Sequence, residues 1–403
     1  MFHEKVIGVP STNLDTFFTG EEGTRKLFMD SITDGERIAV MEGVMGLYDG
    51  LGGILEEGSS YHLAKVTKTP IVLVVDAKGM GRSVVSLLAG FLAYDKEQLI
   101  RGVILNRISK GYYERIKPLI EKELNLCVAG FLPEKEEFHI GSRHLGLVLP
   151  DEPEGAGELA DDGESTAEEA CAGGTGNAKG TIGAESMMNG PVIAVARDEA
   201  FCFYYADNLR LLEENGAKIR YFSPLRDEEL PNGCQALLFG GGYPELYAGK
   251  LSGNHKMRAA VRNAVENGMP IVAECGGFLY LHSAMKDKEG VSHEMAGVLP
   301  AVCFYTGKSV RFGYVEMRDE QGHFLPKGET IKGHEFHYYE STDNGTDAAA
   351  VKPVTGKEYP CVIEDENRWM GFPHLYYPSN PAFAKAFVEK AERYGRRGLG
   401  TGI

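Results

Sequence analysis

The stretch Pro-Ile-Val-Ala-Glu-Cys-Gly-Gly-Phe-Leu-Tyr, residues 270–280, decides how the fold of this chain is interpreted. Residues 271–273 form a short apolar run behind a proline, which is typical of a buried strand. Cys275 follows that strand at once, and Gly276 and Gly277 lead into a segment with helical character. Strand, cysteine, two glycines and helix are typical of a nucleophile elbow, because glycines allow a sharp turn of the backbone.

The position of Cys275 has two interpretations. A thiol at the start of a helix feels the positive end of the helix dipole, which lowers its pKa and increases the reactive thiolate at pH 7. The alternative is a buried structural cysteine beside a tight turn. The local pattern does not decide between them, because such a motif needs its structural context.

Length, charge and cysteine content narrow the class of protein. The chain of 403 residues has room for two or three domains, and its 43% hydrophobic and 25% charged residues are typical of globular proteins. A formal net charge of −16 argues against nucleic acid or an anionic membrane as the main partner. We find no apolar run long enough for a membrane span and no apolar signal region, so we expect a cytoplasmic protein. The seven scattered cysteines indicate reduced thiols.

The first 150 residues alternate between strand and helix patterns, which predicts an α/β domain with a parallel, doubly wound sheet. We expect strands at 37–41, 70–75, 102–105 and 128–133, and helices at 83–94 and 112–124. Ligands of such sheets bind at the carboxyl ends of the strands. Glu42, Asp49, Asp76 and Asn106 all lie there. One acid at such a position can be a simple loop cap, but four polar residues at successive strand ends indicate a site.

Residues 151–190 interrupt this alternation. The segment contains ten acidic residues, nine glycines and a single basic residue, Lys179. Its few large apolar side chains cannot offset the entropy lost on ordering, so we predict an acidic, glycine-rich disordered linker. The predicted organisation is therefore a first domain over 1–150, this linker, a second domain over 191–395 and a flexible tail over 396–403.

A second doubly wound α/β order follows the linker. We expect strands at 192–196, 218–222, 236–239 and 271–273, and helices at 205–216 and 257–267. The strand at 236–239 runs into a glycine triplet, and a glycine-rich loop by itself is more often a turn than a site. Placed one strand before the elbow, the N–H groups of Gly241 and Gly242 are candidates for half of an oxyanion hole. The N–H of Gly276 would supply the other half.

A cysteine nucleophile needs a base, and three histidines late in the chain are candidates. His334 and His337 lie in Gly-His-Glu-Phe-His-Tyr, and His374 lies in Phe-Pro-His-Leu-Tyr. A base that is distant in the sequence and close in the fold is normal for such pairs. Spacing alone does not choose among the three, and a histidine with a purely structural role remains the alternative for each.

Together these motifs resemble the cobyrinic acid a,c-diamide synthase family. The resemblance rests on Ala-Glu-Cys-Gly-Gly-Phe-Leu-Tyr-Leu, Phe-Gly-Gly-Gly-Tyr-Pro-Glu, Gly-His-Glu-Phe-His-Tyr and the late His-Leu-Tyr. The front half is also similar, in Asn13-Leu14-Asp15, residues 42–50, Val75-Asp76-Ala77 and Arg143-His144-Leu145-Gly146-Leu147. The resemblance covers nearly all of the chain outside 151–190. It implies a P-loop-type ATP domain followed by a class I glutamine amidotransferase-like domain.

The resemblance also implies an activity and the residues that carry it. Family members amidate the a and c acetate side chains of a corrin precursor, using ATP, magnesium and glutamine. Cys275 would attack the glutamine amide carbon and His374 would be the base. Tyr376 stands where related glutaminases often have an acid, so we expect a pair rather than a triad. In the ATP domain, the resemblance implies a magnesium-linked Glu42, a substrate-positioning Asp49 and an adenine contact at Asn106.

The sequence departs from this family in one respect. Members begin with a strand, Gly-x-x-x-x-Gly-Lys-Ser/Thr and a helix, whose backbone N–H groups and lysine hold the phosphates. That pattern is found nowhere in the 403 residues. We therefore expect a chain that is shorter than the family pattern by roughly 30–50 residues, the usual size of a strand-helix unit, with weak binding of Mg-ATP.

Two hypotheses of different class follow. The first is an ATP-dependent, glutamine-hydrolysing corrinoid synthase represented by an incomplete chain, with amidation of a nickel tetrapyrrole as a substrate variant. The second is a glutaminase or binding remnant without ATP chemistry. The ring metal of the substrate, the order of the a and c amidations, and whether the chain acts as a monomer or a homodimer stay open.

Overall fold

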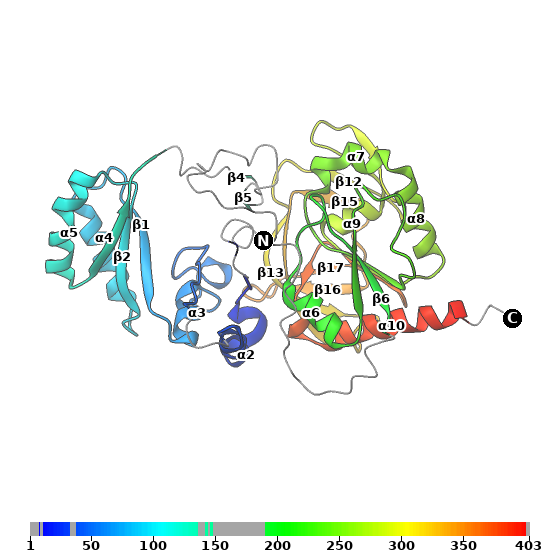
Figure 1. Ribbon diagram of the computed structural model, residues 1–403, viewed down its shortest axis with the longest axis horizontal. Coiled ribbons are helices and arrows are strands. Elements are labelled where there is room, and N and C mark those ends of the chain that lie inside the picture. Colours follow the sequence, from blue (N-terminus) through cyan, green and yellow to red (C-terminus); the bar gives the residue numbers. More distant parts are fainter. Residues whose placement is uncertain are drawn as a thin grey trace. The chain divides into compact units, whose positions relative to one another are not determined.

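The computed structural model describes residues 8, 11–32, 38–135, 142–143, 146–147 and 190–399. The chain divides into two compact units, residues 1–178 and residues 179–403, and each unit is described by itself (Figure 1). The predicted linker lies outside the described residues, apart from Gly190. Residues 396–399 of the predicted tail continue the last helix, and residues 400–403 lie outside the described part.

The first unit is built on a three-stranded parallel sheet in the order β1-β2-β3. Its strands are β1 (Ile71–Asp76), β2 (Ile100–Asn106) and β3 (Cys127–Leu132), and its helices are α2 (Thr16–Ser31), η1 (Leu51–Gly53), α3 (Ser60–Thr67), α4 (Ser83–Tyr94) and α5 (Lys110–Leu124). The two-residue strands β4 (Ser142–Arg143) and β5 (Gly146–Leu147) pair with each other. The strands and helices predicted between residues 70 and 133 are confirmed.

The core of the first unit lies on one face of this sheet. Leu73 and Val75 of β1 are buried against α4 and α5, which lie on the same side of the sheet (Figure 1). Val72 and Val74, which point to the opposite face, are 50% and 62% exposed. Asp76 ends β1 directly opposite the last residue of β2 in the parallel register. Asp76 and Asn106 therefore lie at one edge of the sheet, as the sequence predicts, whereas Glu42 and Asp49 follow no strand in the part of the chain that the structure describes.

The predicted strand at 37–41 is wrong. Residue 37 lies outside the described part, and residues 38–44 adopt no regular structure. Ile38 and Val40 are 92% and 87% exposed. An apolar run becomes a strand only where a neighbouring strand accepts its hydrogen bonds and a packed layer covers one face. No strand among the described residues pairs with this run.

The second unit contains a six-stranded sheet in the order β18-β19-β9-β8-β6-β7, parallel from β19 to β7. Its strands are β6 (Val192–Ala196), β7 (Lys218–Phe222), β8 (Ala236–Phe239), β9 (Ile271–Glu274), β18 (Ile363–Glu364) and β19 (Arg368–Gly371). The helices of the unit are α6 (Ala206–Glu214), η4 (Pro244–Tyr247), α7 (Ala248–Gly253), α8 (His255–Glu266), α9 (Gly276–Leu281), η5 (Tyr377–Ser379) and α10 (Ala382–Leu399). All the strands and helices predicted between 192 and 281 are confirmed.

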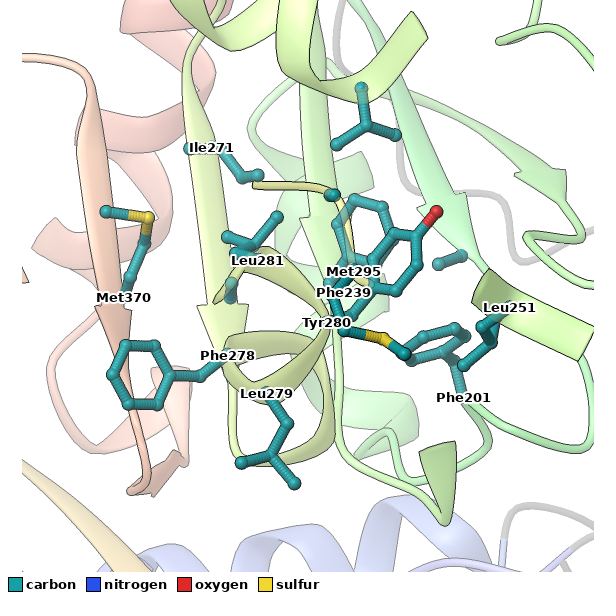
Figure 2. Close-up of a cluster of buried hydrophobic side chains, with 14 of the residues drawn as sticks. Phe201, Phe239, Leu251, Ile271, Phe278, Leu279, Tyr280, Leu281, Met295 and Met370 are labelled. Atoms are coloured by element: carbon teal, nitrogen blue, oxygen red, sulfur yellow. The ribbon is translucent and has the colours of Figure 1, made fainter. Parts of the chain in front are cut away.

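Both faces of this sheet are covered, which makes it doubly wound. Alternate residues of one strand enter different cores: Ile271 and Ala273 face the layer of α7, α8 and α9, whereas Val272 faces the layer of α6 and α10. Figure 2 shows the first of these cores, where Phe239 and Tyr280 pack against Phe201. The continuous apolar strands follow from burial on both faces. The α/β fold class with parallel sheets is confirmed.

Two further sheets that the sequence did not predict, one mixed and one antiparallel, complete the described part of the second unit. A four-stranded sheet has the order β11-β10-β12-β15, with β10 and β12 parallel, and a five-stranded sheet has the order β17-β16-β13-β14-β20. Their strands are β10 (His282–Lys286), β11 (Ser292–Glu294), β12 (Leu299–Tyr305), β13 (Arg311–Asp319), β14 (Thr330–His337), β15 (Tyr339–Ser341), β16 (Ala348–Val351), β17 (Glu358–Cys361) and β20 (His374–Leu375). Between Gly371 and His374 the chain crosses from the six-stranded sheet to the five-stranded sheet.

Candidate active site

Cys275 lies at a strained turn between β9 and α9. Its φ of 47° and ψ of −103° are unusual for a residue with a side chain. The backbone holds it there, because the Cys275 N–H donates to the Gly371 carbonyl at 2.8 Å and its own carbonyl accepts from the Leu279 N–H at 2.9 Å. Backbone strain of this kind collects at functional sites. The geometry therefore favours the nucleophile elbow over a structural cysteine.

The glycines after Cys275 are required by close packing. A Cβ on Gly277 would lie 2.5 Å from the Phe239 side chain and carbonyl, and the Gly277 N–H donates to Gly240 at 2.9 Å. A Cβ on Gly276 would lie 3.1 Å from the Gly242 nitrogen. The elbow therefore packs directly on the loop of residues 240–242 that follows β8, which we call the glycine loop.

Replacing Gly277 with alanine should destabilise the second unit. The new methyl group would overlap backbone atoms of Phe239, and such overpacking costs roughly 1–3 kcal/mol. Gly249, a helical position of α7 where a Cβ would meet nothing within 4 Å, is the matched control. Urea unfolding should give a lower midpoint for Gly277→Ala and an equal or higher midpoint for Gly249→Ala. Equal midpoints for wild type and Gly277→Ala would contradict the packing argument.

The glycine loop lies between the elbow and His374. Gly242 adopts a φ of +155°, and a Cβ on Gly241 would overlap the His374 ring. The Gly241 carbonyl accepts from the Cys202 and Phe203 N–H groups, both at 3.0 Å. The structure thus brings together all three predicted oxyanion-hole glycines and one of the three histidine candidates.

The three histidines differ in their surroundings. His374 of β20 pairs with His334 of β14, and the two rings stack with centroids 4.7 Å apart. The Nδ1 of His334 lies 3.1 Å from the Tyr205 hydroxyl. His337 instead directs Nδ1 to the Tyr339 carbonyl at 2.6 Å. Among the three, His374 is the one whose ring lies against the glycine loop.

The predicted fall in the pKa of the Cys275 thiol is wrong for this structure. Burial raises the pKa of that thiol, and the negative charges of Glu245, Glu335 and Glu274 raise it further. The N–H of Gly276 hydrogen-bonds the thiol and lowers the pKa, but burial is the larger effect. Cys275 is a buried residue, only 7% exposed. Desolvation of the thiolate therefore outweighs the favourable helix start, and the resting thiol is protonated.

Burial also controls the histidine pair. It lowers the pKa of His374 well below 6.5, and the neighbouring His334 and His337 lower it further. Burial lowers the pKa of His334 to about 4. Both imidazoles are therefore neutral at pH 7, and a neutral imidazole can accept a proton.

The segment after His374 is held by residues that the sequence did not point to. The Tyr376 hydroxyl donates to Asp207 of α6 at 2.9 Å. Asn208 donates to the Leu375 carbonyl and accepts from the Tyr377 N–H, each at 2.8 Å. A buried carboxylate is thus present near position 376, but it comes from α6 and binds Tyr376. The one sequence signal for Asp207 is its place in an amphipathic helix. That pattern does not indicate a partner 169 residues away.

Besides Asp207, the sequence did not point to the carboxyl group of Glu274, which directly precedes Cys275. Glu274 is 6% exposed and accepts hydrogen bonds from the Leu375 N–H and from the Tyr377 hydroxyl, the latter at 3.3 Å. Burial raises the pKa of this carboxyl to about 8. A charged residue type inside a buried strand pattern was the available signal, because such residues are almost never buried without a partner.

The site residues predicted in the first unit lie on its surface. Glu42 and Asp49 are exposed in the loop before η1, and Asn106 is half-buried at the end of β2. Asp76 forms an ion pair with Arg107 at 3.0 Å, and Arg107 and Lys78 both pair with Glu134. Within the described ranges, no group of three or more His, Cys, Asp or Glu side chains is arranged to hold a metal ion.

Residues 192–380 match the CobB/CobQ-like glutamine amidotransferase domain. A protein named cobyrinate a,c-diamide synthase from Caldanaerobacter subterraneus subsp. tengcongensis is 39% identical over 98% of this chain and 90% of its own length. One of the same name from Fusobacterium nucleatum is 35% identical over 93% of this chain and 88% of its own length. Among solved structures, PurLQS from Thermotoga maritima is 19% identical and covers 52% of this chain and 100% of its own, with a TM-score of 0.35 that carries no argument.

None of the helices that the structure describes has both the length and the apolar character needed to cross a membrane. The six cysteines among the described residues are all free thiols, in agreement with the prediction of reduced cysteines.

Proposed function

Because this chain belongs to the cobyrinate a,c-diamide synthase family, we propose that it amidates the a and c carboxylates of cobyrinic acid or a close corrinoid precursor. The ammonia comes from glutamine, and ATP activates the carboxylates. The observation that carries the glutamine half of the proposal is the strained Cys275 turn, packed on the glycine loop that contacts His374. The cytoplasmic location predicted from the sequence stays a prediction.

The geometry supports the following course of glutamine hydrolysis. The Cys275 sulfur attacks the amide carbon of glutamine while its proton passes to His374. The N–H of Gly276 and those of the glycine loop stabilise the negative charge that develops on the amide oxygen. His374 then protonates the nitrogen, which leaves as ammonia. Water hydrolyses the remaining thioester, with His374 again taking a proton, and glutamate is released.

The ATP half of the proposal rests on membership of the family, and fewer contacts in the structure support it than support the glutamine half. Magnesium is commonly held by one or two carboxylates together with substrate phosphates and water. A single exposed carboxylate, Glu42, fits only as one ligand of such a shared site. Asp49 and Asn106 are the proposed contacts of the corrinoid and of the adenine. No step of the reaction above runs through the metal.

A combined assay tests this function. We expect the purified chain to release glutamate from glutamine, and to form a corrinoid amide when Mg-ATP and cobyrinic acid are also supplied. Ammonium chloride in place of glutamine serves as the control for the ATP half, because it bypasses Cys275. Absence of both glutamate and amide would overturn the proposal.

A glutaminase without ATP chemistry is the second candidate. It is favoured by the absence of a Gly-x-x-x-x-Gly-Lys-Ser/Thr pattern from the 403 residues. Glutamate release without amide formation, from either glutamine or ammonium, would support it. Isothermal titration with Mg-ATP provides an independent reading, since the lack of this phosphate-binding pattern predicts weak binding.

A further inference from the structure

Glu274, the residue directly before the proposed nucleophile, connects the strand of Cys275 to the segment of His374. It has no part in the reaction proposed above. Glu274 is the last residue of β9 and shares its face with Val272, which belongs to the apolar core under α6 and α10. The whole residue is only 6% exposed, so its side chain is buried. Charged residue types are almost never so buried unless they bind a partner. The partners of this carboxyl therefore indicate its role.

Within the described part of the chain, the hydrogen-bond donors to the Glu274 carboxyl come from the segment that carries the candidate base. The Leu375 N–H, on the residue after His374, donates to it, and so does the Tyr377 hydroxyl at 3.3 Å. One side chain thus links the strand of Cys275 to the strand of His374.

We propose that Glu274 is a positioning residue that sets the placement of the His374 imidazole relative to the Cys275 thiol. This inference rests on the glutamine hydrolysis proposed above. Glu274 acts through its two hydrogen bonds and does not touch the reacting atoms.

The short strand of His374 explains why such a link is needed. β20 has two residues and, among the described strands, pairs only with β14, so its ladder supplies few hydrogen bonds. Asn208 of α6 holds Leu375 and Tyr377 from one side. The Glu274 carboxyl holds the same residues from the side of β9. A shift of about 1 Å between reacting groups can cost a hundredfold in rate, so this second attachment has a kinetic consequence.

Glu274 can connect the two segments as a neutral carboxyl group. Burial raises its pKa to about 8, so the carboxyl is mostly uncharged at pH 7. Glu274 in turn raises the pKa of the titratable groups around it, which are the hydroxyls of Tyr377 and Tyr204 and the Cys275 thiol. A negative charge on Glu274 raises the pKa of the thiol. A neutral side chain of the same shape, glutamine, should therefore replace it well.

Three variants separate positioning from folding. Glu274→Gln keeps an oxygen that can accept the Leu375 N–H, whereas Glu274→Leu removes both acceptors and leaves an apolar group in an apolar core. Glu364→Leu is the matched control, because Glu364 is also 6% exposed, has a pKa raised to about 8 and accepts the backbone N–H groups of His323 and Phe324.

Each variant is tested in the full chain by thermal unfolding, by glutamine hydrolysis, and by the rate at which iodoacetamide alkylates Cys275, followed by peptide mass spectrometry. We expect Glu274→Leu to lower both kcat and the alkylation rate at pH 7 by about a hundredfold, with little change in the KM for glutamine. Glu274→Gln should stay within about threefold of wild type, and Glu364→Leu should alter only the unfolding temperature.

Two results would overturn the inference. If Glu274→Leu alkylates and hydrolyses like wild type, the link has no positioning role. If Glu274→Gln is as impaired as Glu274→Leu, the ionisable carboxyl itself is required. The alkylation rate needs no glutamine. If the wild-type chain fails to hydrolyse glutamine, the proposed function fails while the positioning of Cys275 is still measured.

Discussion

Replacing Cys275 with serine is expected to abolish glutamine hydrolysis, with a loss on the order of 10⁴- to 10⁶-fold in kcat, as for other nucleophile replacements. The thiol is buried and protonated at rest, so the attack requires transfer of its proton to His374. A serine hydroxyl is far less acidic than a thiol, so the same transfer becomes much more costly. Glutamate release measured by an enzyme-coupled assay should fall to the background rate.

The control for this variant is Cys234→Ser, which changes a half-buried free cysteine that has no place in the proposed site. It should hydrolyse glutamine at the wild-type rate. Circular dichroism and thermal unfolding should show that both variants are folded. Substantial glutamate release by Cys275→Ser would rule out this cysteine as the nucleophile, and the strained turn would then need another explanation.

Replacing His374 with alanine is the second large effect, expected to lower kcat by about 10²- to 10⁴-fold, which is the usual contribution of a general base. Its ring is neutral and lies against Gly241, so it can accept the proton of the thiol beside the proposed oxyanion hole. Removing the ring leaves the thiol protonated and also leaves the departing ammonia without a proton donor. Steady-state kinetics of glutamine hydrolysis is the measurement.

The matched control is His334→Ala, because His334 stacks on His374 and occupies the facing position of β14. It should lose less activity, since it supports the base without carrying the proton. If His334→Ala were the more severe variant, the base would be assigned to the region of β14.

The same argument predicts the acid side of the pH profile. A histidine with an ordinary pKa near 6.5 would become protonated, and inactive as a base, as the pH falls to about 6. Because burial lowers the pKa of His374, the ring stays neutral at that pH and glutamine hydrolysis should persist. The acid limb of kcat/KM should therefore lie below pH 6.5, and it should be absent from the residual activity of His374→Ala.

Much of the second unit could be predicted because its signals are local. Apolar runs of four or five residues, such as 192–196 and 236–239, are buried on both faces, so composition alone identifies them as strands. The glycines at 276 and 277 marked a turn that no larger residue fits. The run at 38–41 has the same composition and forms no strand, because strand formation also requires a partner.

The candidate site was predictable in its parts and not in its connections. The elbow, the glycine loop and the late histidines are contiguous motifs, so the sequence shows them one at a time. The carboxyl groups that hold the segment of His374 come from Glu274 and Asp207, which lie about 100 and 170 residues away along the chain. The sequence around Glu274 or Asp207 does not indicate which residue either of them binds.

By itself the sequence determined which segments are strands and helices in the parallel sheets, where the sharp turn with Cys275 falls, and which family the chain resembles. These properties depend on neighbouring residues: the spacing of apolar side chains and the freedom of glycine. Only the tertiary structure decided that His374 is the histidine beside the glycine loop, that Glu274 connects its strand to that of Cys275, and that the pKa of the thiol is raised. Burial and hydrogen bonding are sums over segments distant in the chain, and desolvation of a charge outweighs the local effect of a helix start.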